Sequence, residues 1–145
     1  MELSSPAFGA NQPIPANHTV KGAGVTPPLM ITNVPDGTAS LAIIVHDPDA
    51  PSGDFTHWII WNISATASVL PENHIPTGAI EGVNDFGKQG YGAPAPPSGT
   101  HRYMFDVYAL NIELPLKPGA SLRELQAAME GHILTQAQLV GTVTA

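Results

Sequence analysis

The stretch LAIIVHDPDAPSGDFTHWIIWNI, residues 41–63, contains two apolar runs separated by a loop rich in proline and carboxylates. Residues 41–46 and 57–63 are aliphatic or aromatic and are bounded by Asp, Asn, Pro or Gly, which is typical of buried β-strands. Three carboxylates and two histidines lie in or beside the loop, although only 12% of the chain is charged. The stretch therefore predicts two core strands with ionisable groups gathered where the strands approach each other.

On either side of this stretch, short apolar segments again alternate with turns rich in proline and glycine. Fifteen prolines and 14 glycines in 145 residues exclude long helices from most of it and favour short strands between turns. Further strands are expected at residues 29–34 and 101–112, and in the second of these Tyr103 and Phe105 begin a clear apolar alternation. We expect a mostly β protein, an antiparallel β-sandwich of two sheets, folded as a single domain over residues 1–145.

One or two short helices are expected near the C-terminus. The segment SLRELQAAMEG, residues 121–131, places Ser121 and Glu124 at the spacing of a capping box. Leu125 and Met129 then lie on one face of the predicted helix. The segment QLVGTVTA that follows is expected to return as a final short strand.

Composition excludes several classes of function. Twelve acidic and five basic residues give a formal net charge of -7, the wrong sign for binding nucleic acid or an anionic membrane surface. The absence of cysteine excludes disulfides and thiolate chemistry. The first residues lack the basic and apolar regions of a signal peptide, and no stretch approaches the length of a membrane span. The expected location is cytoplasmic, without stable membrane insertion.

Two proline-rich loops each lead into a strand that opens with a histidine, His57 in one case and His101 in the other. If these strands pair in one sheet, the two imidazoles would meet beside Asp47, and Tyr103 would lie nearby. Imidazole and phenol groups can donate hydrogen bonds to phosphoryl or carboxylate oxygens, while a carboxylate fixes a histidine tautomer. The arrangement predicts a pocket for a small anion. Arg102 is expected to point to the opposite face and to pair with a carboxylate there.

Other readings of these loops fit less well. The segment DPDAPSGDFTHW lacks the ligands and the closing glutamate of an EF-hand, since Trp58 stands in the place of that glutamate. His46, Asp47, His57 and His101 show no local spacing typical of a metal site. No GxSxG elbow precedes a helix. We therefore expect no catalytic nucleophile, no metal and no cofactor, and Asp54 is expected to be a solvated turn residue.

Several segments carry a resemblance to a known family. They include DPDAP at residues 47–51, GTHRY at 99–103 and NDFGKQGYGAP at 84–94. With further similarity at both ends of the chain, the sequence resembles the phosphatidylethanolamine-binding proteins, whose bacterial branch is often labelled Raf kinase inhibitor-like.

The resemblance implies a β-sandwich with an anion-binding pocket at one end. Ala95 stands where the family often has a glycine, which is expected to narrow the pocket mouth or change its backbone. A cis peptide bond is expected at Pro51. The ligand-binding residues that the resemblance implies are Asp47, Asp49, Pro51, His57, Pro96, Pro97, His101 and Tyr103.

Three classes of function stay open at this point. The first is a binding or regulatory module for a small anion or phosphorylated ligand, or for a protein partner that presents one. The second is a hydrolase or proton-transfer enzyme that uses His57 or His101 as general base. The third is a structural homodimer without a ligand. We favour binding because the sequence offers no evident nucleophile, metal or oxyanion hole.

Overall fold

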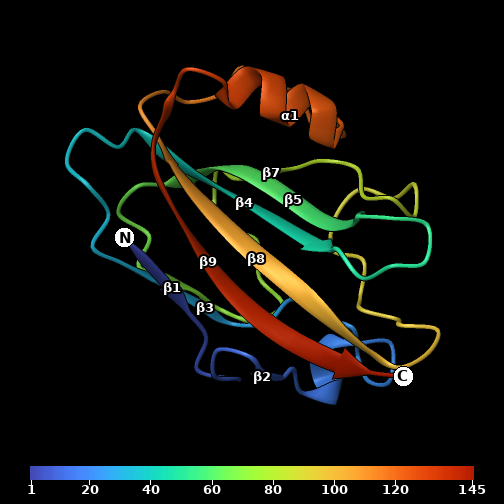
Figure 1. Ribbon diagram of the computed structural model, residues 1–145. Helices are drawn as coiled ribbons and strands as arrows, with labels where there is room; N and C mark the ends of the chain where they lie inside the picture. The colour runs from blue at the N-terminus through green and yellow to red at the C-terminus, as the bar shows by residue number, and fades with distance from the viewer.

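Strand β4 (Ser40–Asp47) lies in the larger of two sheets, between β8 (Thr100–Leu110) and β5 (Phe55–Ser64). The computed structural model describes residues 1–145, and Figure 1 shows its two sheets. The larger sheet has the order β2-β9-β8-β4-β5-β7, and the smaller has the order β1-β3-β6. The remaining strands are β1 (Glu2–Ser4), β2 (Gln12–Pro13), β3 (Leu29–Thr32), β6 (Val69–Leu70), β7 (Ile80–Glu81) and β9 (Ile133–Thr144). The predicted mostly β sandwich is confirmed.

The unbroken apolar run of β4 arises because this strand is buried on both faces. Leu41, Ile43 and Val45 belong to the core between the two sheets. Ala42 and Ile44 point the other way and pack in a second core beneath the helix. A run without alternation is what a strand buried on both sides requires.

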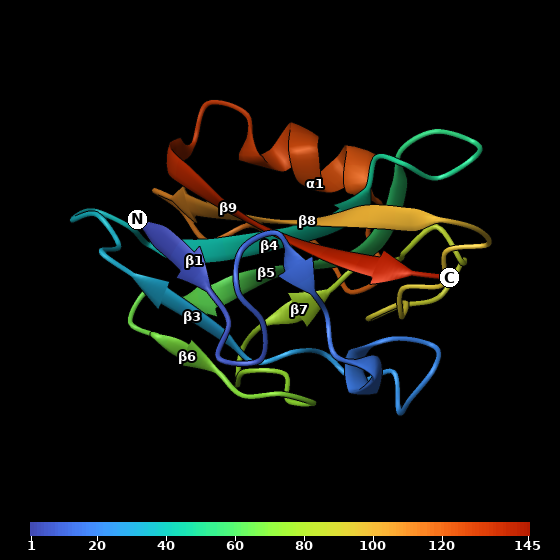
Figure 2. The same ribbon diagram turned by 60° about the horizontal axis from the view of Figure 1, so that its bottom comes forward.

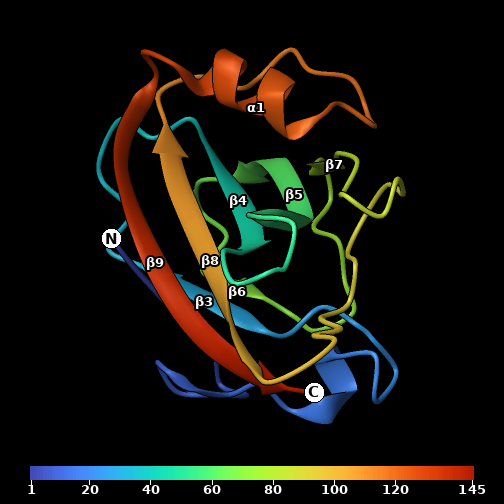
Figure 3. The same ribbon diagram turned by 45° about the vertical axis from the view of Figure 1, so that its right-hand side comes forward.

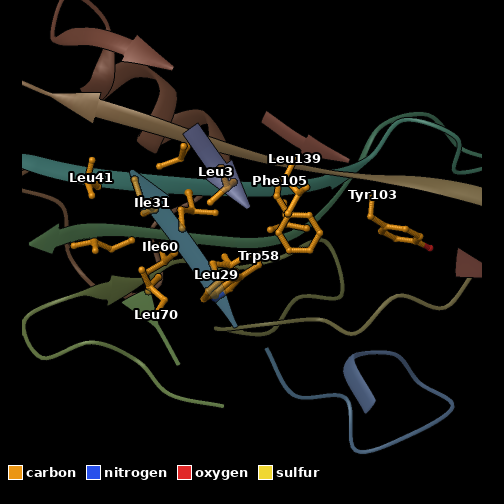
Figure 4. Close-up of a cluster of buried hydrophobic side chains, with 14 of the residues drawn as sticks. Leu3, Leu29, Ile31, Leu41, Trp58, Ile60, Leu70, Tyr103, Phe105 and Leu139 are labelled. Carbon is orange, nitrogen blue, oxygen red and sulfur yellow. The ribbon is translucent and has the colours of Figure 1, made fainter. Parts of the chain in front are cut away.

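Strand β8 shows the predicted alternation. Tyr103, Phe105 and Val107 are buried in the core between the sheets, whereas Asp106 and Tyr108 on the opposite face are only partly buried. In Figure 4 core side chains from both sheets meet, and Tyr103 lies at one end with its hydroxyl pointing away from the other labelled residues. The apolar core therefore ends at Tyr103, beside the loops that form the site.

Helix α1 (Leu122–Met129) is the one helix near the C-terminus, and it begins with the predicted capping box. Ser121 Oγ accepts from the backbone N–H of Glu124 at 3.2 Å, and Glu124 Oε1 accepts from the backbone N–H of Ser121 at 3.1 Å. Leu125 and Met129 are buried against the larger sheet, on the side away from the smaller sheet (Figure 3). A short 3-10 helix, η1 (Ala16–His18), lies near the N-terminus. No helix has both the length and the apolar character that crossing a bilayer requires.

The final strand is longer than predicted. β9 pairs with β8 from Ile133 to Thr144. Its first half was not predicted as a strand, because the polar residues Thr135, Gln136 and Gln138 weaken the apolar pattern there. Its last residues also pair in parallel with β2, so one short pair departs from the predicted antiparallel arrangement. The N-terminal segment that carries β2 packs on β9 at Gly141, where an added Cβ would lie 2.5 Å from Ile14 Cγ1 and 2.7 Å from Phe8 Cε2.

The close approach at Gly141 generates a stability prediction. The substitution Gly141→Ala should lower the free energy of unfolding by about 1 to 3 kcal/mol, because the new methyl group displaces Ile14 and Phe8. Urea unfolding followed by tryptophan fluorescence measures the effect. The matched control is Gly9→Ala, whose Cβ would meet only Gln12 Cγ at 3.4 Å and should change stability by less than about 0.5 kcal/mol. Equal effects of the two substitutions would contradict the prediction.

Candidate functional site

Loops from distant parts of the chain gather at one end of the sandwich. They are the loop after β4, the segment before β8 and the turns around η1, and Figure 2 shows them at the end that also holds the C-terminus. A cavity of about 230 Å³ lies between the loop after β4 and the segment before β8. Four of the predicted residues line it, namely Pro51, His57, Pro97 and His101. Surface hollows of about 290 to 530 Å³ occur elsewhere, but none of them brings two histidines together.

His101, near the start of β8, is held by Asp47 at the end of β4. Its Nδ1 donates to Asp47 Oδ2 at 2.7 Å, and Asp47 Oδ1 accepts from the backbone N–H of Asp49 at 2.8 Å. Asp47 is only 3% exposed, so it lies behind the imidazole and does not line the cavity. Because the carboxylate accepts at Nδ1, the neutral ring must present an unprotonated Nε2.

His57 comes from β5 and reaches the cavity from the other side of β4. Its strand does not pair with β8 directly, because β4 lies between the two and is hydrogen-bonded to both. His57 Nδ1 donates to the backbone oxygen of Gly92 at 2.6 Å, and the Gly92 N–H donates to the His57 backbone oxygen at 2.7 Å. Burial lowers the pKa of His57, which favours the neutral ring.

Tyr103 lies beneath the cavity and not on its wall. Its ring packs edge-on against His57, with ring centres 5.2 Å apart, and the side chain is 1% exposed. Burial raises the pKa of Tyr103, and the nearby Asp47 carboxylate adds to the shift. The phenol therefore stays protonated. Pro96 is next to the wall residue Pro97 but is not itself part of the lining.

Asp49 lies outside the cavity in a bidentate pair with Arg102. Arg102 Nη2 donates to Asp49 Oδ1 at 2.8 Å, while Arg102 Nε and its backbone N–H donate to Oδ2 at 3.0 and 2.9 Å. The guanidinium holds the pKa of Asp49 well below its usual range. The expected carboxylate partner of Arg102 is therefore confirmed.

Asp54 is exposed beside a turn, as predicted, and it also makes a contact that was not predicted, with His46. His46 Nδ1 contacts Asp54 Oδ1 at 2.8 Å, and its Nε2 contacts Asp106 Oδ2 at 2.8 Å. Hydrogen bonds from Asp106 and then Asp54 raise the pKa of His46 to about 9, against the opposing effect of burial. Nothing in the local sequence pairs these residues, since Asp106 is 60 positions from His46.

The expected cis peptide at Pro51 is not found, as every peptide bond is trans. The Gly53 N–H donates to the Ala50 backbone oxygen at 3.0 Å, which puts Pro51 at the second position of a β-turn. A trans proline has the fixed φ angle that this position requires. Pro51 thus still shapes the cavity wall.

Four further residues line the cavity but were not among the predicted site residues: Ala50, Ser52, Phe55 and Phe86. Ala95, which was expected at the pocket mouth, also lines it. The rings of Phe55 and Phe86 meet edge-on at 4.8 Å, and Phe86 also contacts His57 at 5.5 Å between ring centres. Phe86 lies in the segment NDFGKQGYGAP, which drew attention only through its resemblance to a family. No group of three or more His, Cys, Asp or Glu side chains has an arrangement able to hold a metal ion.

The two sheets and the cavity among the loops at one end define a β-sandwich protein with an end cavity. The family described as phosphatidylethanolamine-binding protein matches residues 4–144, nearly the whole chain. The chain therefore belongs to the phosphatidylethanolamine-binding protein family.

Individual relatives agree with this assignment. A UPF0098 protein of Pyrococcus horikoshii is 50% identical over 94% of this chain and 73% of its own length. A UPF0098 protein of Methanothermobacter thermautotrophicus is 46% identical over 97% of both chains. Among solved structures, a phosphatidylethanolamine-binding protein homologue from Chlamydia trachomatis superposes with a TM-score of 0.96 at 40% identity, covering 99% of this chain and 97% of its own. Escherichia coli YbcL gives 0.92 at 30% identity, covering 99% and 98%.

The raised pKa of His46 generates a pH-dependent stability prediction. A folded-state pKa of about 9, above the unfolded value of 6.5, adds stability that is complete below pH 6.5 and lost as pH rises through 9. The substitution His46→Gln should therefore cost on the order of 2 kcal/mol at pH 6, after screening of the exposed Asp54 is allowed for, and much less at pH 9.5. Urea unfolding at both pH values measures the difference.

The matched control for this experiment is His74→Gln, since His74 is exposed. It should have little effect at either pH. An equal loss of stability at pH 6 and pH 9.5 in the His46→Gln protein would show that the cationic pairing contributes nothing.

Proposed function

We propose that the protein binds a small oxyanion, a phosphoryl or carboxylate group, in the cavity lined by His57 and His101, and acts as a binding or regulatory module. The observation that supports the proposal is that the Nε2 atoms of both histidines are free to bind a ligand. Each imidazole is fixed through Nδ1, neither Nε2 has a partner within the chain, and both rings line the cavity. Such rings are oriented and yet keep one hydrogen-bonding position for a ligand.

The size of the cavity supports a ligand the size of a head group. Its volume of about 230 Å³ lies below the roughly 300 to 1,000 Å³ typical of pockets for larger organic ligands. Pro51, Pro97 and the rings of Phe55 and Phe86 form mostly apolar walls. Low polarity around the imidazoles strengthens the few hydrogen bonds that a ligand can make there.

Charge balance at the site also supports an anion, although the chain as a whole is acidic. The three carboxylates of the loop are already paired with His101, Arg102 and His46. None of them lines the cavity. An incoming anion therefore meets imidazole and apolar groups, not an unpaired carboxylate.

The tautomers determine how an anion is held. A neutral imidazole whose Nδ1 carries the proton presents a lone pair at Nε2, which repels an oxyanion, whereas the protonated ring presents an N–H donor. The Asp47 carboxylate lies at Nδ1 of His101, while the buried His57 has a lowered pKa and a neutral carbonyl partner. We assign the donor role to His101 and the acceptor role to His57. This pair suits an oxyanion that keeps one proton, such as the monoanion of a phosphate monoester.

This assignment predicts that phosphate binding is coupled to protons. Affinity for methyl phosphate should fall about tenfold or more between pH 5.5 and 8.5, because its monoanion loses the one proton that His57 Nε2 would accept. Isothermal titration calorimetry in buffers of different ionisation heat measures affinity and proton uptake. Sulfate, which carries no proton to donate to His57, should bind more weakly at pH 6.

Variants separate the two roles. His101→Ala should abolish phosphate binding, and Asp47→Asn should weaken it, because the amide removes the countercharge behind the ring. The control is His132→Ala, since His132 lies near the end of α1, outside the cavity lining. Methyl phosphate affinity that stays constant with pH, or phosphate affinity that survives in His101→Ala, would contradict the proposal.

One contact favours a second candidate function, proton-transfer or hydrolytic catalysis. A carboxylate bound to His101 Nδ1 at 2.7 Å is the arrangement that orients a general base, and Ser52 lines the same cavity. Turnover of p-nitrophenyl acetate or p-nitrophenyl phosphate that is lost in both His101→Ala and Ser52→Ala would support catalysis. Binding without turnover leaves the binding function as the better description.

A further inference from the structure

A second hollow adjoins the anion cavity. Its volume is about 450 Å³, and it shares two wall residues, Phe86 and Ala95, with the cavity. Val20, Tyr91 and the aliphatic part of Lys88 contribute to its surface, which is mainly apolar. We call this hollow the Phe86 groove. Because the two spaces share two wall residues, the groove adjoins the cavity that contains the two histidines.

The loop that carries Phe86 is held in place by its own hydrogen bonds. The buried Asn84 accepts through Oδ1 from the backbone N–H groups of Phe86 at 2.9 Å and Lys88 at 3.3 Å. Its Nδ2 donates to the Gly90 backbone oxygen at 2.9 Å. The Phe86 ring packs directly on Gly92, where an added Cβ would lie 2.5 Å from Phe86 Cδ2. The groove is therefore preformed.

Folding alone does not account for the exposure of the groove residues. Phe86 is 48% exposed and Val20 is 57% exposed, and both lie along this one hollow. Large apolar side chains exposed to water are unfavourable unless a ligand or partner covers them. Where several lie side by side, they indicate a binding surface. Because the groove adjoins the anion cavity at Phe86 and Ala95, a substituent on a bound anion is the nearest group that could cover these side chains.

Charge limits which substituent fits the groove. No carboxylate lines it, and the Lys88 ammonium has no ion-pair partner in the chain. A cationic substituent would meet a like charge without a compensating anion, whereas an uncharged apolar substituent would cover Phe86 and Val20.

Building on the proposed function, we infer that the Phe86 groove is a second subsite that selects anions carrying an uncharged alkyl or aryl substituent and discriminates against cationic ones. The substituent packs on Phe86, and Lys88 supplies the discrimination. Despite the family name, ethanolamine phosphate is then a poorer ligand for this chain than an apolar phosphate monoester of similar size.

Calorimetry at pH 6 with a set of phosphate esters tests the inference. The set is inorganic phosphate, methyl, butyl, phenyl and dodecyl phosphate, and O-phosphorylethanolamine. Each fully buried methylene adds up to about fourfold in affinity, so butyl phosphate in this open groove should bind about tenfold more tightly than methyl phosphate. O-Phosphorylethanolamine should bind at least about fivefold more weakly than butyl phosphate. If dodecyl phosphate binds still more tightly than butyl phosphate, the natural ligand is a lipid. If the two affinities are equal, it is a small metabolite. Both results agree with the proposed subsite.

Matched variants locate the effect in the groove. Val20→Ser should lower the affinity ratio of butyl to methyl phosphate about threefold, whereas Val69→Ser, an equally exposed valine on β6, should leave that ratio unchanged. Lys88→Glu should raise the affinity for O-phosphorylethanolamine relative to butyl phosphate, and Lys117→Glu, outside the groove, should not.

The outcomes separate the two proposals. Binding of inorganic phosphate with no dependence on the ester group, or with O-phosphorylethanolamine as the tightest ligand, overturns the subsite and leaves the anion site standing. Absence of binding by inorganic phosphate and by every ester overturns both. An ester preference that Val20→Ser and Val69→Ser alter equally also overturns the subsite, because the apolar contact would then lie elsewhere.

Discussion

The candidate site depends on the attachment of one loop to the larger sheet through its carboxylates. Three carboxylates lie in the loop between β4 and β5 or at its start, at the end of β4, and each is bound by a basic side chain from β4 or β8. The pairs are Asp47 with His101, Asp49 with Arg102, and Asp54 with His46. The charges at this end of the strands therefore hold a proline-rich loop in one position, and the cavity wall is a consequence of that attachment.

The same hydrogen bonds that fix the histidines also determine what the site can do. His101 and His57 each use Nδ1 for a contact within the protein, to a carboxylate in one case and to the backbone oxygen of Gly92 in the other. What is left for a ligand is the Nε2 atom of each ring, one ring bound to a carboxylate and the other to a neutral carbonyl. Similar residues placed without these contacts would have neither a fixed tautomer nor a division of roles.

The sequence predicted those elements whose signal is local. Alternation along β8, the apolar run of β4 and the capping box of Ser121 all depend on residues close together in the chain. The full length of β9, the link from Asp54 through His46 to Asp106 and the place of Phe86 on the wall depend on packing between distant segments. His57 and His101 could be predicted as site residues because both follow rigid loops and match positions of the family pattern. The same pattern also predicted Asp49 as a site residue, but Asp49 pairs with Arg102 outside the cavity.

The placement of β4 between the strands of the two histidines has a kinetic consequence. Asp47 and His101 are 54 positions apart, and β8 pairs with β4 only after the intervening segments have been brought together. Closing such long loops before their contacts can form slows folding, and sandwiches of this kind fold in roughly milliseconds to seconds. The cavity cannot exist until that assembly is complete, so occupancy by an anion would report the finished native state and not a partly folded intermediate.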